Sequence, residues 1–202
     1  MQLTKQDLDD LMQCAMAAAR EAGTFIQASA VKGIKVQHKN GGSNIAAQVV
    51  TAVDLRADAL ITEALQPTCA RYDLALLTEE STDNRARLEK HAFWSVDPLD
   101  GTKEFIKRRG DFTVNIALVE EGEPTRGVVY APARGRMFYT TADGRTVEER
   151  GDLEPQTTGP IAPIHVGAPD NTALMVVASK SHRDQATDDY IGKYSVADTK
   201  SA

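Results

Sequence analysis

Cysteine is scarce in this chain, and no run of apolar residues is long enough to cross a membrane. The 202 residues include two cysteines, Cys14 and Cys69, too few for the disulfide framework of a small secreted domain. The first ten residues are polar and acidic, unlike a secretory leader. These absences predict a cytoplasmic protein with no integral membrane segment, and they leave peripheral association with the inner membrane open.

Positive charge is also in deficit. Lys and Arg number 23 against 29 Asp and Glu, which gives a formal net charge of -6. Such a chain does not bind nucleic-acid backbones by general electrostatics, so we expect no nucleic-acid partner, although a local basic patch could hold a small anionic ligand. Hydrophobic residues make up 42% of the sequence, which is enough to build a core and excludes general disorder.

The most informative stretch runs from Phe93 to Phe105 and reads Phe-Trp-Ser-Val-Asp-Pro-Leu-Asp-Gly-Thr-Lys-Glu-Phe. Its apolar start, Phe93 to Val96, predicts a buried strand. We expect the strand to end at Asp97, because Pro98 cannot donate to a ladder and holds the preceding residue extended. The chain must therefore turn at this point.

Two carboxylates, Asp97 and Asp100, lie three residues apart across that turn. Gly101 permits a bend that a Cβ would block, and Thr102 to Ile106 predicts the start of a helix. Hard divalent cations prefer oxygen ligands, and the free N–H groups of a helix start can donate hydrogen bonds to phosphate. The pattern predicts a combined phosphate and metal site, although every residue type in it also forms ordinary surface turns.

The flanking residues narrow this choice. Lys103-Glu104-Phe105-Ile106-Lys107-Arg108 follows, and then Asp111-Phe112-Thr113-Val114-Asn115-Ile116-Ala117-Leu118. The whole string resembles the signature of the inositol monophosphatase superfamily, a group of magnesium-dependent, lithium-sensitive phosphatases. Within it, the string closely resembles one branch, the CysQ-type 3'(2'),5'-bisphosphate nucleotidases.

The resemblance implies a site for two or three Mg²⁺ ions. The ligands it implies are Glu79, Asp97, Asp100 and the backbone carbonyl of Leu99. Glu79 follows an apolar strand, Leu74 to Leu77, as a glutamate does in the family. By itself the pair Glu79-Glu80 is equally typical of a solvated loop.

The resemblance also implies catalytic roles for Thr102, Asp54 and Glu79. Thr102 would orient the attacking water together with Asp54, which ends a Val-Thr-Ala-Val-Asp string similar to the family's Val-Thr-x-x-Asp. Taken alone, Asp54 would be a plain helix N-cap. The backbone N–H groups of Gly101 and Thr102 would hold phosphate oxygens.

Further residues are candidates for substrate contact. His182, in Ser179-Lys180-Ser181-His182, resembles a family strand end that faces the nucleotide, although a histidine there is also typical of a capping or solvated residue. The substrate-binding set implied by the resemblance is Glu79, Leu99, Asp100, Gly101, Thr102 and His182. Four basic residues that we expect on the helix after Gly101 could meet a second phosphate or simply face solvent: Lys103, Lys107, Arg108 and Arg109.

The activity implied by the resemblance is removal of the 3'-phosphate of 3'-phosphoadenosine 5'-phosphate, which gives AMP. The sulfated analogue is a further candidate substrate, and a homodimer is compatible with the sequence. The alternatives are an inositol or sugar-phosphate monophosphatase and a non-catalytic fragment that binds metal or lithium.

Hydrophobic periodicity and the resemblance together predict a layered α+β and α/β sugar-phosphatase fold. An N-terminal α+β domain, residues 1–160, would carry the metal and phosphate site at the strand ends of a mixed or antiparallel sheet. Residues 161–202 would begin an incomplete α/β domain. The expected helices span residues 7–30, 55–65 (ended by Pro67), 102–109 (closed by Gly110) and 184–193. The expected strands span 33–37, 48–51, 74–77, 93–96, 112–119, 126–130, 136–140, 173–179 and 194–198, with a lid or plain connection at 38–44 and a linker at 151–167.

The resemblance covers essentially the whole chain and breaks off at its end. Family members continue with a Gly-Ser-Ser-x-Lys segment and a Trp-Asp motif that completes the metal site, whereas the one tryptophan here is Trp94. We therefore expect a C-terminally truncated chain that turns over substrate poorly or not at all.

Overall fold

A computed structural model describes residues 3–32, 36–38, 49–151, 157–168, 170–179 and 183–201. The chain divides into two compact units, residues 1–164 and residues 165–202.

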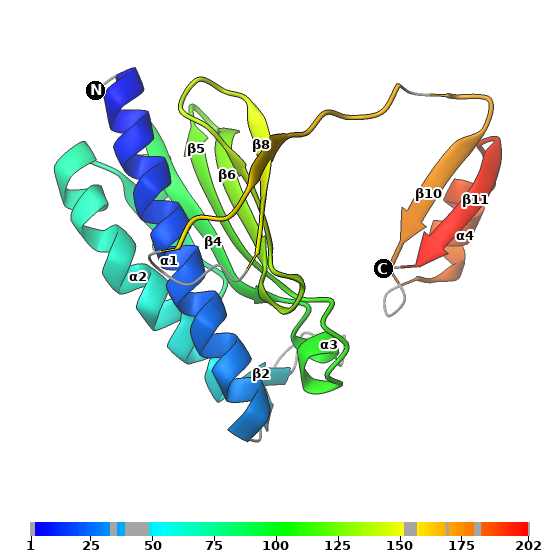
Figure 1. Cartoon of the computed structure of the whole chain (residues 1–202), viewed down its shortest axis with the longest axis horizontal. Coiled ribbons are helices and arrows are strands. Elements are labelled where there is room, and N and C mark those ends of the chain that lie inside the picture. Colours follow the sequence, from blue (N-terminus) through cyan, green and yellow to red (C-terminus); the bar gives the residue numbers. More distant parts are fainter. Residues whose placement is uncertain are drawn as a thin grey trace. The chain divides into compact units, whose positions relative to one another are not determined.

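The first unit stacks two helices on one face of a seven-stranded sheet (Figure 1). The helices are α1 (Lys5–Lys32) and α2 (Ala52–Tyr72), and both contact strands of the sheet. The sheet order is β3-β4-β5-β6-β7-β8-β9, with β3 and β4 parallel and every other neighbouring pair antiparallel. Its strands are β3 (Ala75–Thr78), β4 (Ala92–Asp100), β5 (Thr113–Glu120), β6 (Glu123–Ala131), β7 (Arg136–Thr140), β8 (Thr146–Arg150) and β9 (Ile161–Pro163).

The core lies between the helices and this sheet. Side chains alternate along each strand, so every second residue of β4, namely Ala92, Trp94 and Val96, is buried against the helices. Leu11 and Ile61 meet them from α1 and α2, and neither is exposed. The residues between them in β4, which include Asp97, face the opposite side of the sheet.

Helix α2 does not end at Pro67, as the sequence predicted, but continues to Tyr72. Pro67 lies on the exposed side of the helix, where the carbonyl that loses its N–H partner is next to solvent. Leu65 and Tyr72, on either side of it, are buried. Thr68 also donates its hydroxyl to the Leu65 carbonyl at 2.6 Å. Packing therefore outweighs the local cost of the proline.

Strand β4 likewise continues past Asp97, contrary to the sequence prediction. Asp97 pairs with Asn115 and Asp100 with Thr113, so two residues of β4, Pro98 and Leu99, oppose a single residue of β5. This is a β-bulge, a place where a strand tolerates proline because the bulged residue need not donate to the ladder. The bulge re-aims the carboxylates at the strand end.

Helix α3 (Thr102–Ile106) is shorter than predicted, and Gly110 does not close it. Arg108 N donates to Phe105 O at 3.0 Å and Arg109 N to Glu104 O at 2.9 Å, and Arg108 has a φ of 56°. This is a Schellman ending with an arginine at the left-handed position. Of the four basic residues expected on the helix, Lys103 alone belongs to it.

The observed bounds of several strands differ from the predicted ones because segments distant in sequence pair with each other. A two-residue turn, Glu121-Gly122, joins β5 to β6, and both residues have positive φ, as a type I′ hairpin requires. The predicted linker contains β9, which pairs with β8. In the N-terminal half, β1 (Val36–His38) pairs with β2 (Val49–Thr51). The proposed lid at 39–44 lies outside the described residues.

The second unit is a small strand-helix-strand element. Strands β10 (Leu174–Ala178) and β11 (Val196–Ser201) pair in parallel, and α4 (Gln185–Ile191) lies between them in sequence. Asp184 caps α4 by accepting a hydrogen bond from Thr187 N at 2.8 Å. The near-continuous apolar run at 173–179 is typical of a buried strand, yet Met175 and Val177 are 56% and 67% exposed, because the described sheet of this unit has two strands. None of the described helices is long and apolar enough to span a membrane.

Candidate active site

The parallel pairing of β3 with β4 brings the ends of both strands to one place. Thr78 is in register with Val96, and Glu79 N donates to Val96 O at 3.0 Å. Glu79 and Asp97, each the next residue along its strand, are therefore neighbours, although 17 other residues separate them in the sequence. This pairing places the two carboxylates on which the sequence prediction depends next to each other.

Asp97 is the most perturbed carboxyl at the site. Burial raises its pKa to about 7, and the negative charges of Glu79 and Asp100 add to this effect. Its Oδ1 atom is buried and has no hydrogen-bond partner among the described residues. Such a carboxylate is stabilised either by a proton shared with its neighbour or by a cation.

The turn after β4 holds the remaining residues of the predicted motif. Thr102 Oγ1 donates to the Leu99 carbonyl at 3.0 Å, which ties the hydroxyl to a predicted metal ligand. Asp100 is exposed, and Gly101 has a φ of 86°. A Cβ on Gly101 would lie 2.6 Å from Asp111 O, so both the backbone conformation and the space require glycine.

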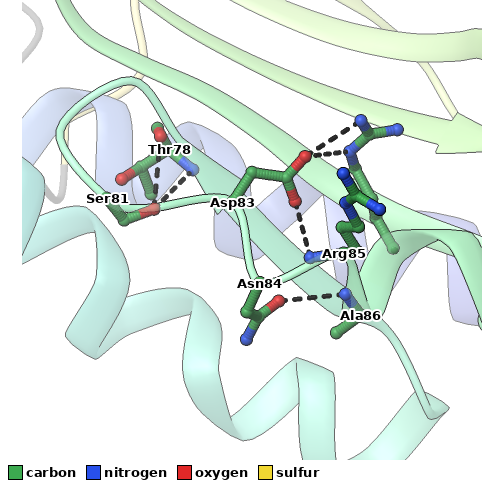
Figure 2. A network of polar contacts seen from close by, with 7 residues as sticks. Thr78, Ser81, Asp83, Asn84, Arg85 and Ala86 are labelled. Carbon is green, nitrogen blue, oxygen red and sulfur yellow. Dashed lines mark hydrogen bonds and ion pairs between the residues drawn. The ribbon is translucent and has the colours of Figure 1, made fainter.

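The turn after β3 is fixed by short-range polar contacts (Figure 2). Ser81 Oγ accepts from Thr78 N at 3.3 Å and donates to Thr78 O at 3.2 Å. Farther along, Asp83 accepts from Arg85 N at 2.9 Å and Asn84 accepts from Ala86 N at 3.0 Å. These contacts lead into η2 (Ala86–Leu88) and hold the backbone that carries Glu79.

Asp54 belongs to the first turn of α2 and is 3% exposed. It is not the residue that caps the helix, because α2 begins two positions earlier at Ala52, directly after β2. The plain N-cap interpretation of Asp54 is therefore wrong. His182, the predicted substrate contact, lies outside the described residues.

The structure adds two polar residues that the sequence prediction missed. Asp58 lies one helical turn after Asp54, and burial raises its pKa while the nearby Thr78 hydroxyl opposes the rise. Asn115 is in register with Asp97. Asp58 Oδ1 and Asn115 Oδ1 are both buried without a hydrogen-bond partner in the part of the chain that is described. A polar residue between Val114 and Ile116 was the available signal for Asn115.

The donor chemistry of this region fits a hard divalent cation, since carboxylate, amide and carbonyl oxygens gather there. The orphaned Oδ1 of Asp97 is the atom that a cation would satisfy. Within the described ranges, no three His, Cys, Asp or Glu side chains are grouped so that they could hold one ion as they stand. A cavity of about 570 Å³ opens beside Glu79, Asp97 and Asn115, on the face of the sheet opposite α1 and α2.

Comparison with known proteins gives consistent matches. The model of the inositol monophosphatase family matches residues 7–201. The 3'(2'),5'-bisphosphate nucleotidase CysQ of Salmonella typhimurium strain LT2 is 41% identical over 143 residues, which are 70% of this chain and 53% of that protein. The Escherichia coli K12 protein of the same name is 39% identical over the same shares. The chain thus spans about half the length of the curated relatives it matches.

Similarity to solved structures confirms the layered α+β sugar-phosphatase fold expected from the sequence. The crystal structure of CysQ from Bacteroides thetaiotaomicron, a bacterial member of the inositol monophosphatase family, superposes with a TM-score of 0.72 at 30% identity. The match covers 96% of this chain and 72% of that one. The Thermotoga maritima IMPase TM1415 superposes with a TM-score of 0.70 at 19% identity, over 95% of this chain and 68% of that chain, and supports the fold alone.

Proposed function

The chain belongs to the inositol monophosphatase family, and we propose that its whole protein removes the 3'-phosphate of 3'-phosphoadenosine 5'-phosphate to give AMP and phosphate. One observation carries this proposal: Glu79 and Asp97 meet at two strand ends, beside the Gly101-Thr102 turn. The choice of substrate is supported by relatives named as 3'(2'),5'-bisphosphate nucleotidases.

We assign magnesium to the carboxylates of Glu79, Asp97 and Asp100 and to the Leu99 carbonyl. Bound magnesium supplies activation of water and neutralisation of charge on the phosphoryl group. When all three carboxylates are ionised they give the site a charge of about -3, which would offset part of the charge of two or three divalent ions. Because burial and the neighbouring charges raise the pKa of Asp97 to about 7, a cation held by this carboxylate would compete with a proton near neutral pH.

The protein's own groups position the reactants. Thr102 Oγ1 donates to the Leu99 carbonyl at 3.0 Å, and we assign to this hydroxyl the orientation of the attacking water, with help from Asp54. We assign the phosphate oxygens to the first backbone N–H groups of the turn, at Gly101 and Thr102, which would donate hydrogen bonds to them. The left-handed φ of Gly101 is what turns this backbone toward the site.

Selection of a bisphosphate requires a second anion contact. Lys103 is the basic residue that α3 holds next to the turn, whereas Lys107, Arg108 and Arg109 follow the helix in its Schellman ending. We assign the second phosphate to this basic group. Replacing each basic residue by glutamine should weaken turnover of the bisphosphate more than turnover of inositol monophosphate.

The test is phosphate release at saturating magnesium from 3'-phosphoadenosine 5'-phosphate and from inositol 1-phosphate. It should be run on the 202-residue chain and on a chain extended to the length of its relatives, each with an Asp97→Asn variant. Preference for the bisphosphate, lost in Asp97→Asn, supports the proposal. Equal or better turnover of inositol 1-phosphate would favour the alternative monophosphatase, and magnesium binding without turnover in the extended chain would favour a non-catalytic role.

A further inference from the structure

Strand β3 carries Glu79 at its end, although β3 is the edge strand of the sheet and, among the described strands, pairs with β4 alone. The residues of β3, Ala75 to Thr78, form a short ladder that ends with the hydrogen bond from Glu79 N to Val96 O at 3.0 Å. The end of a short edge strand opens more readily than the centre of a sheet. The position of Glu79 beside Asp97 therefore depends on contacts outside this ladder.

Helix α2 supplies such a contact, because it packs against β3. Thr78, the last residue of β3, is 4% exposed. Its hydroxyl faces the carboxyl of Asp58, which lies on α2 one helical turn after Asp54, and it lowers the pKa of that carboxyl against the rise caused by burial. The hydroxyl has no hydrogen-bond partner elsewhere in the described residues. Asp58 is therefore the group toward which Thr78 is directed.

Asp58 is kept at this position at a cost to the fold. Its Oδ1 atom is buried and has no hydrogen-bond partner within the described ranges, which is unfavourable for a carboxylate. The charged group that acts on its pKa, the carboxylate of Glu80, has the same sign and raises that pKa further. The packing of α2 does not explain an aspartate here, whereas the contact with Thr78 does.

Holding Thr78 toward α2 also fixes the direction of the next side chain. Side chains alternate along a strand, so Thr78 faces α2 and Glu79 begins on the opposite face. Glu79 and Asp97 both line the cavity on that opposite face. Ser81 fixes the backbone of Thr78 with two hydrogen bonds, but neither involves the Thr78 side chain. The contact between Asp58 and the Thr78 hydroxyl therefore anchors the end of β3 to α2 and keeps Glu79 on the side of the cavity.

We propose that Asp58 is a positioning residue for the candidate active site: its carboxyl holds the Thr78 hydroxyl, and through it keeps Glu79 beside Asp97. Asp58 itself is not assigned to the metal or to the substrate. Its importance for phosphate release rests on the proposed function, whereas its effect on the end of β3 requires neither metal nor substrate. The two can therefore be tested separately.

The test is hydrogen exchange of the 202-residue chain in EDTA, followed by NMR at the Glu79 amide. Thr78→Val removes the hydroxyl and keeps the shape of the side chain, so the Glu79 amide should exchange about tenfold faster. Asp58→Ala should have the same effect. Thr78→Ser keeps the donor and Asp58→Asn keeps an acceptor, so both should retain most of the protection.

A matched control is Thr125→Val. Thr125 also donates its hydroxyl to a carboxylate, that of Glu120, which pairs with Ala92 at the start of β4 and not at its metal-site end. This variant should leave the exchange of the Glu79 amide unchanged. An unchanged Glu79 rate in Thr78→Val, or an equal acceleration at the amides of β5, would overturn the proposal, because the second result would mean a general loss of stability.

Magnesium titration by calorimetry gives a second readout on the same variants. Thr78→Val and Asp58→Ala should weaken magnesium binding about tenfold, although neither residue is an assigned ligand, and Thr78→Ser and Asp58→Asn should retain it. Absence of magnesium binding in the unmodified chain would refute the metal assignment of the proposed function. The exchange rate of the Glu79 amide would still decide the role of Asp58.

Discussion

Replacing Asp97 by asparagine should stabilise the metal-free chain at alkaline pH while removing its response to magnesium. Burial and the charges of Glu79 and Asp100 raise the pKa of Asp97 from 3.8 to about 7. The folded chain therefore keeps a proton that the unfolded chain releases. Stability must fall as the pH rises from about 4 to about 7 and then level off.

The size of this effect follows from the shift. About three pKa units at roughly 1.4 kcal/mol each give about 4 kcal/mol. Asp97 is only partly buried, and solvent screening reduces the effect to about 2 kcal/mol. Asparagine keeps the shape and carries no charge, so Asp97→Asn should lose this pH-dependent term and be more stable than the unmodified chain at pH 8.

Urea unfolding of the EDTA-treated chain at pH 5 and pH 8 measures this term. A suitable control is Asp143→Asn, because hydrogen bonds from Thr141 and Arg145 lower the pKa of Asp143 to about 2 and its whole titration lies below this pH range. Magnesium added at pH 8 should stabilise the unmodified chain and not Asp97→Asn. If Asp97→Asn shows the same loss of stability between pH 5 and pH 8 as the unmodified chain, the assigned burial and charge coupling are refuted.

Three further substitutions test the framework. Gly101→Ala should lower the free energy of unfolding by about 2 kcal/mol, because backbone strain and a clash with a backbone carbonyl add together. Gly122→Ala, at a similar φ but with open space around it, should lower the free energy of unfolding by about 1 kcal/mol. Equal losses for the two variants in urea unfolding would contradict the clash. Arg20→Met should lower the free energy of unfolding by about 3 kcal/mol, because it leaves the buried carboxylate of Glu149 without its ion-pair partner. The double variant Arg20→Met with Glu149→Leu should recover most of that loss in urea unfolding. Pro67→Ala should raise the melting temperature, by restoring a helical N–H worth about 1 kcal/mol or more; a lower value would mean that the proline packs favourably.

The sequence alone predicted the elements for which local residue patterns and the resemblance to the family agree. The helical spacing of apolar residues predicted α1 within two residues at each end, and Arg136–Thr140 was predicted as observed. The Asp-Pro-Leu-Asp-Gly-Thr string predicted a turn with two carboxylates. The family and its fold were predicted from the resemblance of this string and its flanking residues to the family signature.

Features that depend on contacts between distant segments of the chain were decided by the tertiary structure. Pro67 would end an isolated helix, but the burial of residues on both sides of it stabilises α2 through this position. Pro98 is tolerated within β4 because its pairing with β5 contains a bulge there. Asn115 lies in an apolar strand, and only its register with Asp97 gives it a place at the site. Arg136 and Arg150 meet because two strands pair. Register is set by burial over the whole sheet, which no local window of sequence contains.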